Sequence, residues 1–332
     1  MRVSVIVPLY NKAKYVMRAL ASIAGQTCGD YEVIVVDDGS TDGSGELAAG
    51  FGDARFRVVQ QANAGPGAAR NRGVAEAQGD LIAFLDADDA WLPEYLESSV
   101  RLLEACGPEV ATVTSGYIDF PPGVSREALW RRRGITEGIQ KVTPSTPIQK
   151  LVHMLAYMWP CSTVARVEVL RRWGGFYDRN SCRYGEDALL FLKVLLNESV
   201  CFHMRPLAQF HRDASSLSGR YQGTRPVEPF LLDPDEVASA CPAELLPLLR
   251  QFYAARAAKT AGVLGYWGDC RNARRLFRQF VSWHDWRLPF FLPGLVGCTP
   301  LARIFGPPLL AAARPLLPGG HRWKLHAGGS NR

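Results

Sequence analysis

Short apolar runs alternate with amphipathic stretches over the first 85 residues. Four apolar runs, each bounded by turn-forming or acidic positions, predict buried strands; they cover residues 3–8, 31–36, 56–60 and 81–85. Between the first two runs, apolar residues at 15, 16, 19, 20 and 23 keep helical spacing. This order predicts an α/β fold with a doubly wound, mostly parallel sheet and helices on both faces.

The pattern is less regular after residue 85. Residues 110–115 predict a further strand, whereas 125–142 are polar, contain a run of three arginines and suggest an irregular segment, either mobile or facing an acceptor. Helical spacing returns over residues 148–157, 167–173 and 183–196. We expect Glu186 and Asp187 in the first turn of the last of these helices, where the helix dipole favours negative charge.

The C-terminal part has a different composition. Residues 244–281 predict two helices, the second capped by Asp269, with four arginines on one face at 271, 274, 275 and 278. Residues 288–302 carry no charge but contain three prolines, and a membrane-spanning helix needs about 18 uninterrupted apolar residues. We therefore predict two domains, a sheet-based domain over 1–225 and a basic helical region over 226–332.

Charge is distributed unevenly along the 332 residues. The net charge is +6, yet residues 250–332 hold thirteen Lys or Arg against two Asp or Glu. This excess predicts that the C-terminal region docks on an anionic membrane surface. The alternative is a solvated basic face on helices that pack against the first domain.

Cysteine spacing and the N-terminus bear on the compartment. The eight cysteines include no C-x-x-C pair, which argues against a zinc site or a disulfide framework and leaves most of them as expected buried apolar residues. The first ten residues lead directly into strand-like sequence without a signal-peptide pattern. We expect a cytoplasmic protein, peripheral at the inner face of the membrane.

Three carboxylates gather after the fourth predicted strand, at Asp86, Asp88 and Asp89. In open α/β sheets such strand ends face the ligand crevice, and crowded carboxylates are stabilised by a hard divalent cation. The second predicted strand also ends in acidic residues, Asp37 and Asp38, so both groups are expected at one crevice. The alternative for the first group is a solvated acidic turn before the next helix.

A glycine-rich turn, Gly65-Pro66-Gly67, opens a predicted helix after the third strand. It is not a dinucleotide-binding fingerprint, because Arg70 stands at the third glycine position and the turn does not follow the first strand. The chain also lacks the G-x-x-x-x-G-K-[ST] pattern of P-loop enzymes.

Six motifs occur in a fixed order: VSVIVPLYN, VVDDGSTD, ARNRG, FLDADD, GGFYD and GED. Together they resemble inverting family 2 glycosyltransferases with the GT-A fold, over residues 3–220. The resemblance implies a nucleotide-sugar donor, usually a UDP-sugar, and a divalent metal, Mn²⁺ or Mg²⁺. It also implies transfer to a glycan or lipid-linked glycan acceptor in cell-surface polysaccharide synthesis, without a nucleic-acid partner.

The resemblance assigns roles on the donor side. Pro8 and Tyr10 line the base pocket, and Asp38 accepts a hydrogen bond from the base. Gly65 and Arg70 are further nucleotide-binding residues. Asp86 lies near ribose and metal, and Asp88 is the metal ligand.

On the acceptor side, Asp187 matches the general base, because a sugar hydroxyl needs a positioned carboxylate to take its proton. Glu186 orients the acceptor or the helix start. Trp159 is either an apolar wall for a sugar ring or a core residue. Asp213 stands where the family often has a histidine, so His211 is the candidate third metal ligand; a structural histidine is the alternative.

Two rival functions stay open. A nucleotidyltransferase acting on sugar phosphates would carry a glycine-rich basic loop near the N-terminus, and residues 7–15 contain no glycine. A catalytically silent scaffold with the same fold would not need Asp38, Asp86, Asp88 and Asp187 together.

Overall fold

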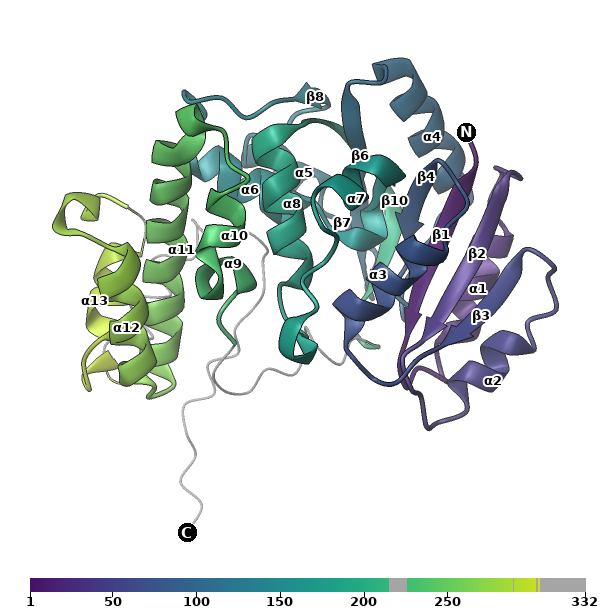
Figure 1. Cartoon of the computed structure of the whole chain (residues 1–332), viewed down its shortest axis with the longest axis horizontal. Helices are drawn as coiled ribbons and strands as arrows, with labels where there is room; N and C mark the ends of the chain where they lie inside the picture. The colour runs from purple at the N-terminus through teal and green to yellow at the C-terminus, as the bar shows by residue number, and fades with distance from the viewer. Residues whose placement is uncertain (215–225, 289, 303, 305–332) are drawn as a thin grey trace, which may run out of the picture. The chain divides into compact units, whose positions relative to one another are not determined.

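The computed structural model describes residues 1–214, 226–288, 290–302 and 304. These residues form two compact units (Figure 1). The first contains residues 1–214 and 228–245, and the second is built from 246 onward together with 226–227. The composition of the sequence predicts a boundary after residue 225. In the structure Tyr177 donates a hydrogen bond to Asp233, and Lys193 pairs with Glu236, so residues 228–245 pack in the first unit.

A parallel four-stranded half of the sheet carries the N-terminal motifs. β1 lies between β2 and β4, and β3 pairs with β2 on the outside. The strands are β1 (Val3–Leu9), β2 (Tyr31–Asp37), β3 (Phe56–Gln60) and β4 (Leu81–Phe84). Because these strands are parallel, their C-terminal ends meet at one edge of the sheet. The predicted strands are confirmed here to within a residue or two.

The other half of the sheet is mixed. β9 runs antiparallel between β4 and β6, and β10 pairs with β6 in parallel. Its strands are β5 (Ala90–Trp91), β6 (Val110–Phe120), β7 (Val124–Ser125), β8 (Gly138–Gln140), β9 (Thr163–Arg166) and β10 (Ser199–His211). The observed fold is thus the mostly parallel α/β sheet that the sequence predicts.

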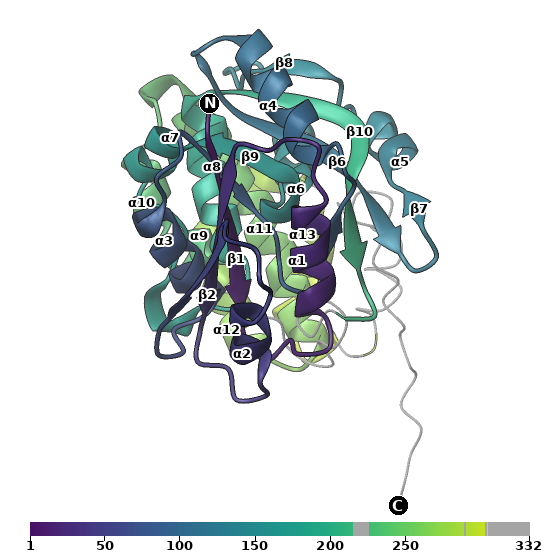
Figure 2. The ribbon, with the colours of Figure 1, turned by 90° about the vertical axis from the view of Figure 1, so that its right-hand side faces the viewer.

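Helices cover both faces of the sheet. Figure 2 shows α1 and α3 on opposite sides of β1 and β2. Every residue of β2 is buried, which explains the apolar run from Val33 to Val36; the buried Glu32 accepts a hydrogen bond from Ser4. The helices of the first unit are α1 (Val16–Ala24), α2 (Ser44–Ala49), α3 (Pro66–Glu76), α4 (Tyr95–Cys106), α5 (Glu127–Arg132), α6 (Ile148–Tyr157), α7 (Val167–Arg172), α8 (Glu186–Asn197), α9 (Pro229–Leu232) and α10 (Pro234–Ala238).

Close packing of α3 on β1 depends on Gly73. A Cβ atom at this position would lie 2.4 Å from a side-chain carbon of Ile6, nearer than side chains approach one another. Interiors packed this densely do not absorb an extra methyl group without strain. The glycine therefore lets α3 lie directly on the strand, and this holds Arg70 near the C-terminal edge of the sheet.

Two expectations from sequence are wrong. Residues 125–142 are not irregular, because Trp130 is only 1% exposed and anchors α5, and β8 pairs with β10. Among the eight cysteines only Cys161 and Cys201 are buried, although all eight are free. The polar sequence of 125–142 gave no sign of the contacts that bury Trp130 and pair β8 with β10. The burial of a cysteine likewise depends on tertiary contacts that residue type does not predict.

The second unit is helical. α11 (Leu246–Tyr266) packs against α12 (Cys270–Phe280) and α13 (Phe291–Gly297). A Cβ on Gly265 would lie 2.1 Å from the backbone oxygen of Gly297, so glycine is required where α11 meets α13. Asp269 caps α12 by accepting a hydrogen bond from the Asn272 amide, which confirms the predicted cap. None of the described helices combines the length and apolar character needed to span a bilayer.

Candidate functional site

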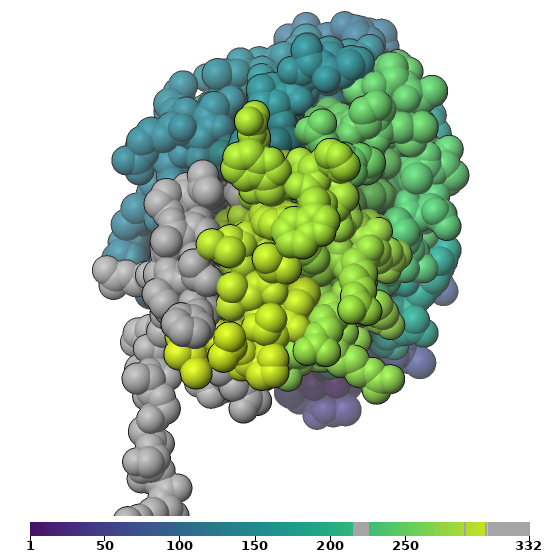
Figure 3. Space-filling model, turned by 90° about the vertical axis from the view of Figure 1, so that its left-hand side faces the viewer, coloured from purple at the N-terminus to yellow at the C-terminus, as the bar shows by residue number. Residues whose placement is uncertain are grey.

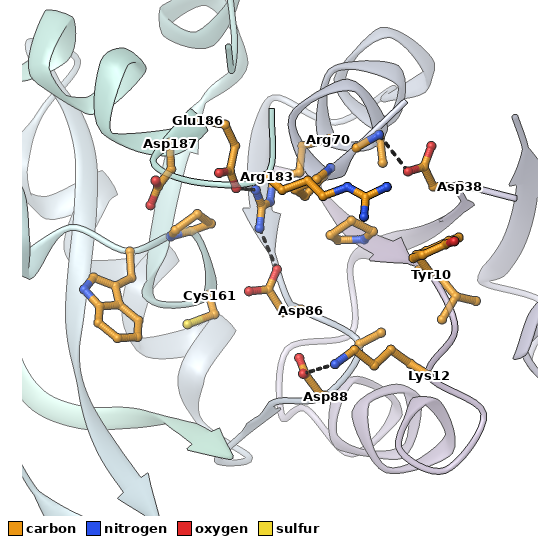
Figure 4. A pocket seen from close by; sticks show the side chains of 18 of the residues that line it. Tyr10, Lys12, Asp38, Arg70, Asp86, Asp88, Cys161, Arg183, Glu186 and Asp187 are labelled. Atoms are coloured by element: carbon orange, nitrogen blue, oxygen red, sulfur yellow. Dashed lines mark hydrogen bonds and ion pairs between the residues drawn. The ribbon is translucent and has the colours of Figure 1, made fainter. Parts of the chain in front are cut away.

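A cavity of about 340 Å³ opens at the C-terminal edge of the parallel strands in the first unit (Figure 4). The ends of β1, β2 and β4 contribute Tyr10, Asp38, Asp86 and Asp88 to its lining. The starts of α3 and α8 contribute further lining residues, namely Gly65, Pro66, Ala69, Arg70, Glu186 and Asp187. Of the predicted site residues, all but His211 line this one cavity, including Pro8 and Trp159.

Asp38 organises the glycine turn. Its side chain is 3% exposed, and its two oxygens accept hydrogen bonds from the Gln61 side chain and from the backbone amides of Ala64 and Gly65, at 2.8, 2.8 and 2.9 Å. Gly65 has φ +96°, a conformation that side chains disfavour, and a Cβ there would meet the backbone of Cys182 at 3.0 Å. Asp38 therefore fixes the loop that forms one wall of the cavity.

Tyr10 lies at the mouth of the same region, with 41% of its surface exposed. The Arg183 guanidinium lies 5.9 Å from the Tyr10 ring centroid and donates a hydrogen bond to Asn63 at 3.1 Å. Tyr10, Arg183 and Asn63 thus bring together three parts of the chain, and a planar ring with two polar groups beside it suits a heteroaromatic base.

Arg70 is buried and joins two carboxylates. It pairs with Asp86 at 2.8 Å and with Glu186 at 2.7 Å (Figure 4). Burial alone would lower the pKa of Arg70, but the charges of Asp86 and Glu186 outweigh it and raise that pKa above its usual range. Arg70 therefore links the acidic loop after β4 to the start of α8.

The other two carboxylates of the acidic loop have different partners. Asp88 pairs with Lys12 at 2.5 Å, and Asp89, 2% exposed, accepts a hydrogen bond from the His211 backbone amide at 2.9 Å. Burial, together with the charge of Asp86, raises the pKa of Asp88. Asp89 thus connects the end of β10 to the acidic loop through a hydrogen bond. The ionised form of Asp88 is stabilised by a neighbouring positive charge, which in this structure is that of Lys12.

The carboxylate oxygens of Asp86 and Asp88 fit a hard divalent cation only if a bound substrate supplies the remaining metal ligands. Asp86 and Asp88 offer carboxylate oxygens in one cavity, but no group of three or more His, Cys, Asp or Glu residues in the described ranges could hold a metal by itself. His211 does not join the two aspartates in such a group, although neither of its buried ring nitrogens has a hydrogen-bond partner. Magnesium-type ions are often bound through one or two carboxylates plus substrate phosphates, and this donor set matches that mode.

Asp187 is the second residue of α8, after Glu186 and the N-cap Gly185, which is in the left-handed conformation at φ +69°. One side of Asp187 is open to the cavity, while protein atoms surround the rest. Burial, with the neighbouring charge of Glu186, raises the pKa of Asp187 to about 7. A carboxylate with this pKa can accept a proton near neutral pH.

Glu186 and Asp187 face different partners although they are adjacent. Glu186 is 8% exposed and bonded to Arg70, so its charge is committed to the link between α8 and the acidic loop. Asp187 has no such cationic partner among the described ion pairs. The geometry separates a structural carboxylate from one that is available for chemistry.

Aromatic side chains form the far wall. Trp159 stacks on Tyr117 with centroids 4.9 Å apart and meets Phe210 edge to face at 5.0 Å. Its indole N–H donates to the Ala156 carbonyl at 2.9 Å, so the ring is held in place while still lining the cavity. A fixed indole of this kind presents an apolar surface to the cavity that Asp187 also lines.

Sequence reasoning missed Lys12, Asn63 and Arg183 as cavity residues. Lys12 directly follows the motif VSVIVPLYN, Asn63 lies two residues before the glycine turn and Arg183 lies two residues before GED, so proximity to a motif was a usable signal. Arg183 comes from the segment before α8, and only folding brings it to Tyr10.

Comparisons with known proteins show the family of the chain. The family model described as "Glycosyl transferase family 2" matches residues 4–173. Glycosyltransferase GlyG of Streptococcus pneumoniae is 46% identical over 224 residues, which cover 65% of this chain and 72% of GlyG. Putative glycosyltransferase EpsH of Bacillus subtilis is 40% identical over 117 residues, 35% of this chain and 33% of EpsH. EpsH is one of several curated relatives of which the chain spans a third or less of the length.

Two solved structures show the same fold. Residues 1–349 of S. aureus TarS in complex with UDP align with a TM-score of 0.64 at 19% identity, covering 94% of this chain and 92% of that one. The corresponding complex with UDP-GlcNAc aligns with a TM-score of 0.61 at 21% identity, covering 95% and 88%.

Proposed function

Because this chain belongs to glycosyl transferase family 2, we propose that it transfers a sugar, with inversion, from a UDP-sugar to a hydroxyl group of a glycan or lipid-linked glycan. One observation carries this proposal. The carboxylate of Asp187, with a pKa of about 7, opens into the same cavity as the aspartates at the ends of β2 and β4. We infer that base, diphosphate and reacting hydroxyl meet in that cavity.

The donor's base would lie against Tyr10. Its ring is exposed at the cavity, and the Asp38-anchored loop provides backbone and Asn63 groups next to it. TarS has been solved with UDP and with UDP-GlcNAc on the same fold, which supports testing uridine nucleotides first. Arg183, beside Tyr10, supplies a positive charge next to the proposed base site.

The diphosphate would lie between the acidic loop and Lys12. Asp86 and Asp88 would hold a divalent cation, Mn²⁺ or Mg²⁺, which when bound neutralises the leaving diphosphate. Arg70 keeps Asp86 in position through its buried ion pair. Lys12, which pairs with Asp88 in this structure, would add the positive charge of a side chain to that of the metal ion.

Asp187 would act as the general base. As the acceptor oxygen forms a bond to the anomeric carbon, the bond from that carbon to the diphosphate oxygen breaks, and the hydroxyl proton passes to the Asp187 carboxylate. Attack from the face opposite the leaving group inverts the configuration. Glu186 has a positioning role, because its carboxylate is bonded to Arg70, and Trp159 provides an apolar wall for a sugar ring.

A donor screen tests the proposal. The protein is incubated with UDP-glucose, UDP-galactose, UDP-GlcNAc and UDP-GalNAc, and UDP release is measured with Mn²⁺, with Mg²⁺ and with a chelator. We expect metal-dependent UDP release from at least one donor, and its loss in Asp187→Asn while UDP binding persists. If UDP binds but no donor is turned over with any oligosaccharide or lipid-linked acceptor, a silent scaffold replaces the enzyme.

A further inference from the structure

The second unit carries an arginine-rich surface that the cavity chemistry does not use. Arg271, Arg274, Arg275 and Arg278 recur at i, i+3, i+4 and i+7 along α12, and all four are exposed. Like charges at this spacing repel one another and destabilise the helix. Such a surface is stabilised when an anion neutralises it.

Among the described residues, no ion pair neutralises these arginines. Residues 246–332 contain two acidic side chains, and both are engaged elsewhere. Asp269 caps the start of α12, and Asp285 accepts hydrogen bonds from Ser282 and pairs with Arg250. No described acidic residue pairs with Arg271, Arg275 or Arg278, and the segments 215–225 and 305–332 contain no Asp or Glu in their sequence.

An apolar rim borders the arginine face. A hollow of about 430 Å³ is lined by Arg274 and Arg278 of α12 together with Trp283, Phe291 and Leu295. Trp283 is 74% exposed although it contacts the Phe291 ring at 5.8 Å between centroids. Figure 3 faces the side on which α12 and α13, in yellow-green to yellow, lie at the surface.

Exposed apolar side chains are concentrated in this unit. Of the fifteen large apolar residues classed as exposed in the described ranges, seven lie between 246 and 304. They are Leu246, Trp267, Trp283, Trp286, Leu292, Leu301 and Ile304. Contact with water disfavours so many exposed apolar side chains in one small unit. The interface of a bilayer, in contrast, accommodates tryptophan and aliphatic side chains beside basic residues.

We propose that α12, Trp283 and α13 form a docking surface for an anionic lipid bilayer. The arginines of α12 contact lipid phosphates, and Trp283 enters the headgroup region. Nucleic acid, the other common polyanion, is less suited to this surface, because its backbone offers no apolar layer for the exposed Leu292, Leu301 and Ile304. The inference does not depend on the proposed function, since lipid binding is measured without turnover.

Vesicle sedimentation with the full-length chain tests the proposal. We expect the protein to pellet with vesicles of phosphatidylglycerol and phosphatidylcholine but not with pure phosphatidylcholine, and less so at high salt. Each arginine near such a surface contributes about a fivefold factor in partitioning. The triple variant Arg271→Gln, Arg275→Gln, Arg278→Gln should therefore partition about a hundredfold less. It leaves Arg274, whose guanidinium bonds to the Cys298 carbonyl, in place.

A matched control removes the same charge elsewhere. Arg101, Arg131 and Arg172 of the first unit are at least half exposed, and their change to Gln should leave partitioning nearly unchanged. The single variant Trp283→Ala should lower partitioning at every salt concentration. Circular dichroism confirms that each variant is folded.

Three outcomes would overturn the proposal. They are equal loss in the two triple variants, equal binding to neutral and anionic vesicles, and binding to single-stranded RNA without any binding to anionic vesicles.

Discussion

The raised pKa of Asp187 makes a quantitative prediction about pH. Its ordinary value is 3.8, and burial together with the Glu186 charge brings it to about 7. The carboxylate accepts a proton only when ionised, so kcat/KM should rise about tenfold per pH unit below 7 and level off above it. A carboxyl group with an ordinary pKa would be ionised throughout this range and give a flat profile.

Two variants identify the group responsible for the profile. Asp187→Asn keeps the shape of the side chain but cannot accept a proton, so transfer should fall by roughly 10²- to 10⁴-fold and the pH dependence below 7 should vanish. Glu186→Gln removes a neighbouring negative charge, so the pKa of Asp187 should fall and the rising limb should move to lower pH.

The assay is initial-rate UDP release between pH 5.5 and 8.5 at subsaturating donor, with metal in excess. UDP affinity is measured at each pH by calorimetry, so that loss of binding is not mistaken for loss of chemistry. A wild-type profile that stays flat from pH 6 to 8 would contradict the raised pKa. A sloping profile that Glu186→Gln does not move would exclude the electrostatic reason given for it.

The same ionisation affects folding. Because the folded pKa lies above the unfolded one, the folded protein binds more protons between pH 4 and 7, and stability should fall as pH rises through that window. The variant Asp187→Asn cannot ionise at this position, so its stability should not fall in this way as pH rises. It should therefore be more stable than the wild type at pH 8 and no more stable at pH 4, as urea denaturation can measure.

Three further substitutions test the site and its support. Asp88→Ala should abolish activity and remove the metal dependence of UDP binding; metal-enhanced binding of unchanged strength in calorimetry would exclude Asp88 as a ligand. Arg70→Ala leaves two carboxylates without their cation, so the free energy of unfolding should fall by about 3 kcal/mol, against less than about 1 kcal/mol for the exposed control Arg72→Ala; equal losses in urea denaturation would refute the buried link. Gly73→Ala inserts a methyl group 2.4 Å from a carbon of β1 and should lower the free energy of unfolding by about 1–3 kcal/mol. The control Gly29→Ala, with nothing within 4 Å, should lower it little. An unchanged melting temperature of Gly73→Ala would show that α3 can move.

The hydrophobic pattern was enough to predict the four parallel strands and the helices between them. Each of these strands is a short, mainly apolar run, and β2 and β4 lead directly into acidic residues, so the local pattern is enough to locate them. The same reasoning predicted that Asp38, Asp86 and Asp88 would share one crevice, because parallel strands end at one edge of a sheet. The start of α12 was predictable as well, since Asp269 needs only its own backbone neighbours to cap the helix.

The sequence by itself determined the order of the elements, the family motifs and which edge of the sheet carries the carboxylates. Tertiary structure alone decided which partner each charged residue takes: Arg70 and Glu186 are 116 positions apart, and Lys12 and Asp88 are 76 apart. It also decided that residues 125–142 are ordered around Trp130 and that Asp187 is desolvated while Glu186 is paired. Spacing along a chain encodes period and capping, whereas the pKa of a carboxylate and the order of a polar segment depend on what folding places beside them.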